Sequence, residues 1–198
     1  MNVIVYAEPI DPTVKITALT VGFFDQTGKG GSLPAPQIAT MPITTILPLG
    51  VGEYRLRVAA TDSTGKSGAV DVPVNTALVG TGPIKLGGLL LGATTEKGVA
   101  PRVTFTSEEK VIAALDIFGT FTDQISAKFE LAKTDIGPAL QTLGAAGGGA
   151  TNEPDKISIF GEIPIAKLEP GDYVIRVIVE MKGSPEVRTM RSFRKLAK

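Results

Sequence analysis

The chain has 198 residues, 43% hydrophobic and 20% charged, and its 20 basic side chains balance 20 acidic ones. This zero net charge provides no field that would attract nucleic acid or an anionic membrane surface. The chain has no cysteine and no histidine, which excludes disulfides, thiol nucleophiles, the usual zinc ligands and any triad with a histidine base.

The N-terminal residues predict β-structure rather than a targeting segment. The opening MNVIVYAEPIDP has no basic segment followed by an apolar run, so we expect no signal peptide here. No apolar run in the sequence is long enough to span a membrane. Residues 3–6 and 13–24 are rich in β-branched and aromatic side chains and predict two strands, and the glycine-rich residues 25–31 predict a turn after them.

A hairpin follows in the middle of the first half. Residues 32–42 contain three prolines and predict a loop, and residues 43–47 predict a short strand. Residues 54–58 alternate between apolar side chains and arginine. The turn sequence DSTGK at 62–66 then leads into a second alternating segment, so we predict a β-hairpin.

Residues 78–83, LVGTGP, predict a boundary between two domains, because this short segment is rich in glycine and separates the hairpin from a new apolar run. We place the first domain at 1–79 and the second at 84–198. Both are long enough to build a core of their own.

The second half predicts further strands and one ambiguous segment. In residues 107–119 the apolar residues fit both helical and strand spacing, and we interpret the segment as a strand. Residues 137–155 predict a long glycine-rich loop, which could carry one helical turn after Pro138. The other predicted strands are 102–106, 125–133, 156–165, 172–181 and 186–193.

A short pattern occurs twice in the chain and indicates the fold. Leu-x-x-Gly-x-Tyr, followed by alternating apolar residues, occurs with Gly52 and Tyr54 and again with Gly171 and Tyr173. The glycine permits a sharp turn, and the tyrosine needs a partner for its hydroxyl on entering a core. The pattern resembles the tyrosine corner of immunoglobulin-like and fibronectin type III-like sandwiches. We therefore predict an all-β chain of two immunoglobulin-like β-sandwich domains in tandem.

Residues 40–120 also resemble a region downstream of the von Willebrand factor A domain in bacterial VWFA-related proteins. The matching residues are Leu49, Gly52, Tyr54, Arg57, Val58, Thr64, Gly65, Gly68, Val72, Pro73, Val74, Leu86, Gly87, Leu89 and Leu90. The A domain itself is absent, since no D-x-S-x-S motif occurs. The resemblance implies an accessory region of a secreted or envelope protein, extracellular or periplasmic, with no known catalytic residues.

Candidates for binding chemistry have simpler interpretations. Asp11, Asp62, Asp123 and the acidic segment 152–155 could bind Ca²⁺, but none has the spacing of a calcium loop, and Asp and Asn are ordinary turn residues. The segment 25–32 lacks the spacing of a phosphate-binding loop. The chain has no tryptophan, and its tyrosines and phenylalanines fall mostly on predicted core faces, which argues against carbohydrate binding.

The outer face of the second domain is the candidate interaction surface. If Tyr173 faces inward, alternation places Val174, Arg176 and Ile178 outward, and Ile112 and Phe118 could face outward on another strand. An apolar outer face of a sandwich can bind a partner. Alternatively, another part of the chain covers it, or the residues are singly exposed.

We therefore expect a structural or protein-interaction module without catalytic residues, cofactor or metal. Its expected partner is another protein or copies of itself, and neither nucleic acid nor a small molecule. The alternatives are a self-assembling subunit of a surface fibre or layer and a sandwich that binds a ligand or carbohydrate. An enzyme would have to build its site without cysteine or histidine.

Overall fold

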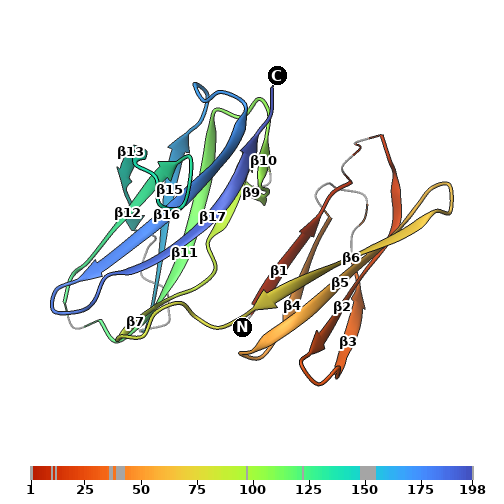
Figure 1. The fold of residues 1–198 in the computed structure, drawn as a ribbon, viewed down its shortest axis with the longest axis horizontal. Helices are drawn as coiled ribbons and strands as arrows, with labels where there is room; N and C mark the ends of the chain where they lie inside the picture. The colour runs from red at the N-terminus through yellow and green to blue at the C-terminus, as the bar shows by residue number, and fades with distance from the viewer. Residues whose placement is uncertain are drawn as a thin grey trace. The chain divides into compact units, whose positions relative to one another are not determined.

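The structure is a computed structural model, and all the regular secondary structure of the residues it describes is β-strand (Figure 1). The chain divides into two compact units, residues 1–77 and residues 78–198, which are described separately. The described residues are 2–9, 11, 13–35, 38, 43–96, 98–121, 123–147 and 155–197.

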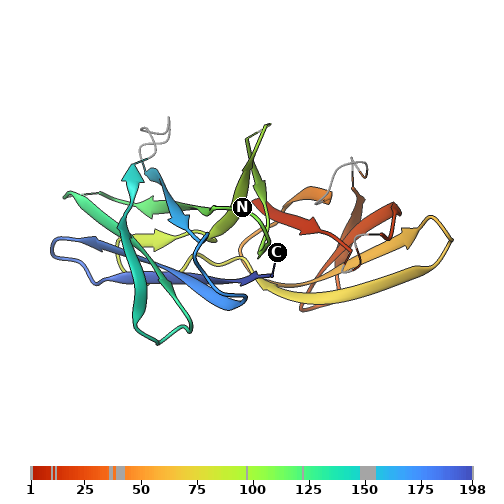
Figure 2. The same ribbon diagram turned by 90° about the horizontal axis from the view of Figure 1, so that it is seen from above.

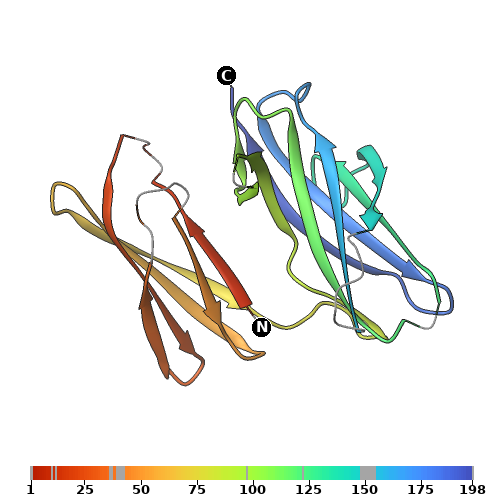
Figure 3. The same cartoon turned by 180° about the vertical axis from the view of Figure 1, so that it is seen from behind.

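Unit 1 contains two antiparallel sheets that enclose one hydrophobic core. A two-stranded sheet, β1-β4, packs on a four-stranded sheet with the order β3-β2-β5-β6 (Figures 1 and 3). The core includes Leu19, Val21 and Leu56 from the larger sheet and Ile43 and Leu47 from the smaller one. The strands are β1 (Asn2–Ala7), β2 (Ile16–Asp25), β3 (Gly30–Pro34), β4 (Ile43–Pro48), β5 (Glu53–Asp62) and β6 (Ser67–Asn75).

Two hairpin turns of unit 1 share one construction, which follows from the sequence pattern D-x-T-G-K. In the β2–β3 turn, the carboxylate of Asp25 accepts hydrogen bonds from the backbone N–H groups of Thr27 and Lys29 at 2.9 and 3.0 Å. Asp62 makes the corresponding bonds in the β5–β6 turn. Gly28 has a φ of +82° and so fits a conformation that favours glycine.

Unit 2 is a larger sandwich with its own hydrophobic core, and its two sheets can be distinguished in the view from above (Figure 2). One sheet has the order β14-β15-β11-β8-β9, with β7 also paired to β11, and the other has the order β10-β17-β16-β12-β13. The strands are β7 (Ile84–Leu86), β8 (Leu90–Thr95), β9 (Gly98–Pro101), β10 (Thr104–Phe105), β11 (Lys110–Gly119), β12 (Ile125–Ala132), β13 (Ala139–Gly144), β14 (Ala146–Gly147), β15 (Lys156–Pro164), β16 (Gly171–Met181) and β17 (Val187–Lys195).

The pairing order of the strands is the same in the two units. The pair β1-β4 corresponds to β11-β15, and the sheet β3-β2-β5-β6 corresponds to β13-β12-β16-β17. Two sheets that are antiparallel except for the parallel pair β10-β17, and that pack over one core with strands crossing between them in this order, form an immunoglobulin-like sandwich. The predicted fold class is therefore confirmed.

In unit 2, a tyrosine pins the turn that enters β16. Tyr173 is buried, and its hydroxyl donates a hydrogen bond of 2.8 Å to the backbone carbonyl of Glu169, four residues upstream. Its ring stacks on Phe193 with the centroids 5.6 Å apart. Gly171 has a φ of +153°, which a residue with a side chain would adopt only with strain. This turn therefore requires a glycine at 171 and is held by the tyrosine hydroxyl.

In unit 1, the matching turn is held differently. Tyr54 is only half-buried, and its hydroxyl makes no hydrogen bond to any residue that the structure describes. The carbonyl of Gly50, four residues upstream, accepts a hydrogen bond of 2.7 Å from the hydroxyl of Thr76. The backbone N–H of Gly52 donates to that same hydroxyl at 2.9 Å. Gly52 has no positive φ, so unlike Gly171 it does not adopt a backbone conformation that favours glycine.

Most predicted strands are confirmed, and the structure also has strands that we did not predict, among them β9 and β14. Residues 110–119 form β11, which confirms the strand interpretation of the ambiguous segment. Residues 139–144 form strand β13, paired with β12, where we expected a loop or a helical turn. Residues 30–34 likewise form β3. Of the predicted loops, 36–37, 39–42 and 148–154 lie outside the described residues.

Candidate interaction surface

The outer face of the sheet β13-β12-β16-β17 carries rows of long side chains from neighbouring strands. Residues that lie directly opposite each other share a face of the sheet. The register places Ile178 between Lys128 of β12 and Arg188 of β17, and places Arg176 between Glu130 and Met190. This face is therefore a mixture of charged and apolar side chains.

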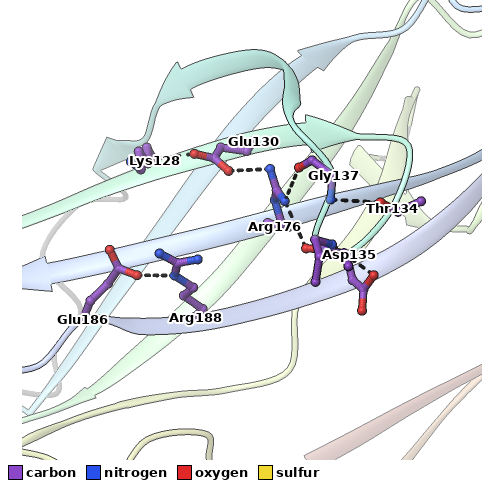
Figure 4. Close-up of polar contacts among 9 residues, drawn as sticks. Lys128, Glu130, Thr134, Asp135, Gly137, Arg176, Glu186 and Arg188 are labelled. Atoms are coloured by element: carbon purple, nitrogen blue, oxygen red, sulfur yellow. Dashed lines mark hydrogen bonds and ion pairs between the residues drawn. The ribbon is translucent and has the colours of Figure 1, made fainter.

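Arg176 is the centre of a polar network on this face (Figure 4). One of its terminal nitrogens lies 2.8 Å from a carboxylate oxygen of Glu130. The other donates to the backbone carbonyls of Asp135 and Gly137, at 3.0 and 2.8 Å. Both the Arg176 and Glu130 side chains are about 15% exposed, so these charges are shielded from bulk water and their pairing is stronger than that of a surface pair.

The two carbonyls that Arg176 binds flank Ile136 in the connection between β12 and β13. Within that turn, the hydroxyl of Thr134 accepts a hydrogen bond from the N–H of Gly137 at 2.9 Å. A carboxylate oxygen of Asp135 accepts one from the N–H of Ile136 at 3.0 Å. The side chain of Ile136 is 91% exposed. A well-fixed turn therefore presents a bare branched apolar side chain to solvent.

Two further apolar side chains are exposed on the same sheet. Met190 lies opposite Arg176 on β17 and is 53% exposed, and Leu140 of β13 is 49% exposed. Single exposed apolar residues are common on protein surfaces and need no special explanation. Three of them on or beside the sheet that carries the partly buried Arg176–Glu130 pair resemble the usual composition of a binding surface, in which apolar anchors are accompanied by polar groups.

The structure differs from the predicted interaction surface in which side chains are exposed. Val174 and Ile178 lie on the outer face of β16 but are buried, so the expectation that they form an exposed apolar face is wrong. The stems of Lys128 and Arg188 flank Ile178 on the two neighbouring strands, and long charged side chains often cover apolar surface in this way. The β12–β13 connection contacts Arg176 directly.

Ile112 and Phe118 do not belong to this surface, because both lie on β11 in the opposite sheet. Ile112 is buried. Phe118 is half-buried, and the ammonium of Lys156 lies 5.8 Å from the centre of its ring. The five predicted residues therefore divide between two sheets, and only Arg176 contributes a polar group to the network described above.

Sequence reasoning missed Ile136, Leu140 and Met190. Ile136 stands in the short segment TDIGP, where an isolated apolar residue between turn-forming residues was a signal that we did not use. Leu140 lies in the part that we predicted as a loop. Met190 could be placed only by knowing which face of β17 points outward.

Several carboxylates have pKa values below the ordinary range, which keeps them ionised. A hydrogen bond from Arg188 holds the pKa of Glu186 below its ordinary value. The hydroxyl of Thr64 does the same for the pKa of Asp62, and that of Thr13 for the pKa of Asp11. These aspartates accept hydrogen bonds within their own turns. The perturbed side chains are therefore set up as fixed anions rather than as proton donors.

Among the described residues, no group of three or more histidine, cysteine, aspartate or glutamate side chains is placed to hold a metal ion. Of the candidate calcium ligands, Asp123 accepts a hydrogen bond from the N–H of Gln124, and residues 152–154 lie outside the described part. No helix capable of crossing a membrane occurs within the described ranges.

Comparison with known proteins shows a distant likeness to a solved structure. No family of known proteins matches the chain, and no curated protein matches it. Among solved structures, the chain is similar to one described as fibronectin(III)-like modules of CbhA from Clostridium thermocellum. The sequence identity is 16%, the match covers 100% of this chain and 85% of that one, and the TM-score is 0.31. A TM-score of 0.31 is too low to support a fold assignment. The assignment therefore rests on the pairing order of the strands.

Proposed function

We propose that this chain is a non-catalytic protein-interaction module, and that the outer face of β13-β12-β16-β17 binds another protein. The observation that carries the proposal is the turn at Ile136. Binding to a flexible apolar loop costs the conformational entropy that the loop loses, whereas this turn is already held by Arg176, Thr134 and Asp135. A preorganised, exposed isoleucine is suited to act as an anchor in a partner's pocket.

The surface around this anchor indicates the kind of partner. Lys128, Glu130, Arg188 and Glu186 supply both signs of charge close to the apolar side chains. A mixed rim of this kind suits a protein surface with its own charges of both signs, because each pair fixes the register of docking. It does not suit a polyanion.

The remaining features of the chain are consistent with a structural role. We interpret the two units as tandem domains and the hydrogen bond of Tyr173 to Glu169 as a tyrosine corner. The resemblance of residues 40–120 to the region that follows the A domain in VWFA-related proteins supports placing this module in a secreted or envelope protein. We therefore propose an extracellular or periplasmic location.

The proposal is tested by comparing two aspartate variants of the chain. Ile136→Asp removes the anchor and adds a charge at the same place. Val99→Asp is the matched control, because Val99 is also exposed but lies on β9 in the other sheet of unit 2. Each protein is immobilised and exposed to the extracellular fraction of its native source, and the bound proteins are identified by mass spectrometry.

The expected result is a partner that binds the wild type and Val99→Asp but is lost with Ile136→Asp. A partner retained by both variants would contradict the proposed surface. Self-assembly into a fibre or layer is the alternative function. Light scattering on the purified chain separates the two, because self-assembly through this face would give oligomers that Ile136→Asp converts to monomers.

A further inference from the structure

Strand β13 stands at one end of its sheet in unit 2 (Figure 1). It pairs with β12 on one side, and in the described part of the chain no strand pairs with its other side. Its sequence, ALQTLG, contains no charged residue and no proline. Natural edge strands often carry such residues, or are very short, and are thereby kept from pairing with other chains. Strand β13 has neither of these protections.

The other strands that stand at the ends of the two sheets of unit 2 are protected. Strands β10 and β14 have two residues each. Strand β9 has four residues and ends with Pro101, which has no backbone N–H to donate. Among these described strands, β13 is therefore the one best suited to pair with an additional strand.

The backbone of β13 turns hydrogen-bonding groups toward its unpaired side. Directly after the strand, the N–H of Ala145 donates to the carbonyl of Ala127 at 2.9 Å. Because the direction of these groups alternates along an antiparallel pair, those of Leu143 also face β12, whereas those of Thr142 and Gly144 face away from it. Residues 142 and 144 are exposed. Their N–H and carbonyl groups are therefore available to another strand.

An irregularity in β13 leaves most of the strand regular. The register with β12 shifts between Leu131 and Ala132, so that Leu140 has no residue directly opposite. Bulges of this kind turn an edge away from pairing where they occur. This one lies near the start of β13, and the pairing from Gln141 to Gly144 is regular. The groups that face away from β12 therefore belong to an ordinary extended strand.

A second copy of β13 complements this edge. Identical strands that pair in the antiparallel direction are related by a two-fold axis, the commonest symmetry of homodimers. An axis at Thr142 places Leu140 of one copy opposite Gly144 of the other. The side chain of Leu140 is 49% exposed, and a Cβ atom at Gly144 would meet no described atom within 4 Å apart from its chain neighbours. Each exposed leucine therefore has open space above a glycine to fill.

The other sheet of the sandwich presents small described residues on this side of unit 2. Strand β14 pairs with β15 and consists of Ala146 and Gly147, which are both exposed. The amide of Gln141 donates to the carbonyl of Pro164 at 3.3 Å and so links the two sheets here. The described part of the second layer therefore places no large side chain in the way of a second copy.

We propose that two copies of this chain form a symmetric dimer, in which their β13 strands pair in the antiparallel direction about a two-fold axis at Thr142. The two sheets then continue into each other. Backbone hydrogen bonds of Thr142 and Gly144 set the register, and Leu140 packs over Gly144 of the other copy. This proposal goes beyond the proposed function, because it uses the edge of the sheet and not its outer face. Either can therefore fail alone.

Single cysteine variants report this pairing directly, because the chain itself has no cysteine. Directly opposite residues of an antiparallel pair lie within the distance that a disulfide spans. Under mild oxidation, Thr142→Cys should form a covalent dimer about ten times faster than Val99→Cys or more, since pairing holds its two thiols together. Val99 is the matched control because it is also exposed but lies on β9 in the other sheet.

Two further cysteine variants test the register. Gly144→Cys alone should cross-link no faster than Val99→Cys, because it lies opposite Leu140 and not opposite itself. A mixture of Leu140→Cys and Gly144→Cys should form the mixed covalent dimer about ten times faster than either variant alone cross-links.

Light scattering on variants of Thr142 tests the backbone bonds. Thr142→Pro removes the N–H that faces the unpaired side but leaves the bonds to β12, whereas Thr142→Val keeps that N–H. The wild type and Thr142→Val should be dimers, and Thr142→Pro should be a monomer with the circular dichroism spectrum of the wild type. Ile136→Asp should remain a dimer, which separates this edge from self-assembly through the outer face.

Three results would overturn the proposal. The first is equal cross-linking of Thr142→Cys and Val99→Cys, which also decides the matter if Thr142→Pro does not fold. The second is a dimer that Ile136→Asp dissociates and Thr142→Pro does not. The third is a monomeric wild type whose captured partner is lost with Thr142→Pro but retained with Thr142→Val, because a strand of another protein would then occupy this edge.

Discussion

At the residue scale, the two matching tyrosines have different tasks. Tyr173 is buried and satisfies the carbonyl of Glu169, whereas the equivalent carbonyl of Gly50 is satisfied by Thr76. The repeated sequence pattern predicts where both turns lie. It does not predict which hydroxyl holds each turn, because Thr76 comes from a strand end more than twenty residues downstream.

The difference gives a direct expectation for two conservative variants. Tyr173→Phe should lower the free energy of unfolding of unit 2 by about 1 kcal/mol, since it removes the hydrogen bond from the tyrosine hydroxyl to the carbonyl of Glu169. Tyr54→Phe should change that of unit 1 by less than about 0.5 kcal/mol. Calorimetric unfolding of both variants measures the effect, and equal losses would contradict the assignment.

Thr76, which follows strand β6, should contribute strongly to the stability of unit 1. It is buried, and its hydroxyl donates to Gly50 and accepts from Gly52. Thr76→Val keeps the shape but removes both bonds, and should cost about 1–3 kcal/mol. Thr76→Ser retains the hydroxyl and serves as the control in urea unfolding. If Thr76→Val and Thr76→Ser lost similar amounts of unfolding free energy, the hydroxyl of Thr76 would not be the group that stabilises the turn.

At the element scale, the connection between β12 and β13 depends on one arginine. Arg176→Lys keeps a positive charge but cannot reach Glu130, Asp135 and Gly137 in the same fixed geometry. We expect amide exchange at residues 134–137 to become faster by about ten-fold, because local opening no longer breaks two charge-assisted bonds.

The matched control for this loop is Arg188→Lys. Arg188 lies on the same face and is more exposed, and it pairs only with Glu186 among the described ion pairs. Its replacement should leave exchange in the connection unchanged. If both variants accelerate exchange equally, or neither does, Arg176 does not hold the turn.

The elements themselves were largely predictable, and the reason is local. Alternating apolar residues define β4, β5, β15 and β16 without any tertiary information. Strand β13 was missed because most of its six residues point to solvent, so no alternation is visible in the sequence. The outer face of β16 was mispredicted because alternation shows which side a residue faces, but not what covers it.

At the scale of the whole molecule, acid should weaken unit 2 through Glu108. Burial opposes ionisation of this carboxyl, but hydrogen bonds from its own N–H and that of Thr106, together with the charge of Arg102, hold its pKa below the ordinary value of 4.5. A group with a lowered pKa stabilises the fold above its unfolded-state pKa, and this contribution is lost as the pH falls through the folded-state pKa.

The corresponding measurement is the free energy of unfolding of unit 2 between neutral pH and the range below 4.5. Glu108→Gln should be less stable than the wild type at neutral pH and should lose less stability on acidification. Glu109→Gln, at the next and exposed position, should follow the wild-type curve. If the free energy of unfolding of Glu108→Gln fell with pH as steeply as that of the wild type, this role of Glu108 would be contradicted.

The central claim of this account is that the chain consists of two sandwiches, each with its own core. Leu56 belongs to the core of unit 1, and Phe129 to that of unit 2. Differential scanning calorimetry of Leu56→Ala and Phe129→Ala tests the claim directly, since each change should cost about 2–5 kcal/mol in the core that it enters. We expect two unfolding transitions. Leu56→Ala should lower the midpoint temperature of the transition of unit 1, and Phe129→Ala should lower that of unit 2. A single transition that both variants lower together would contradict the claim.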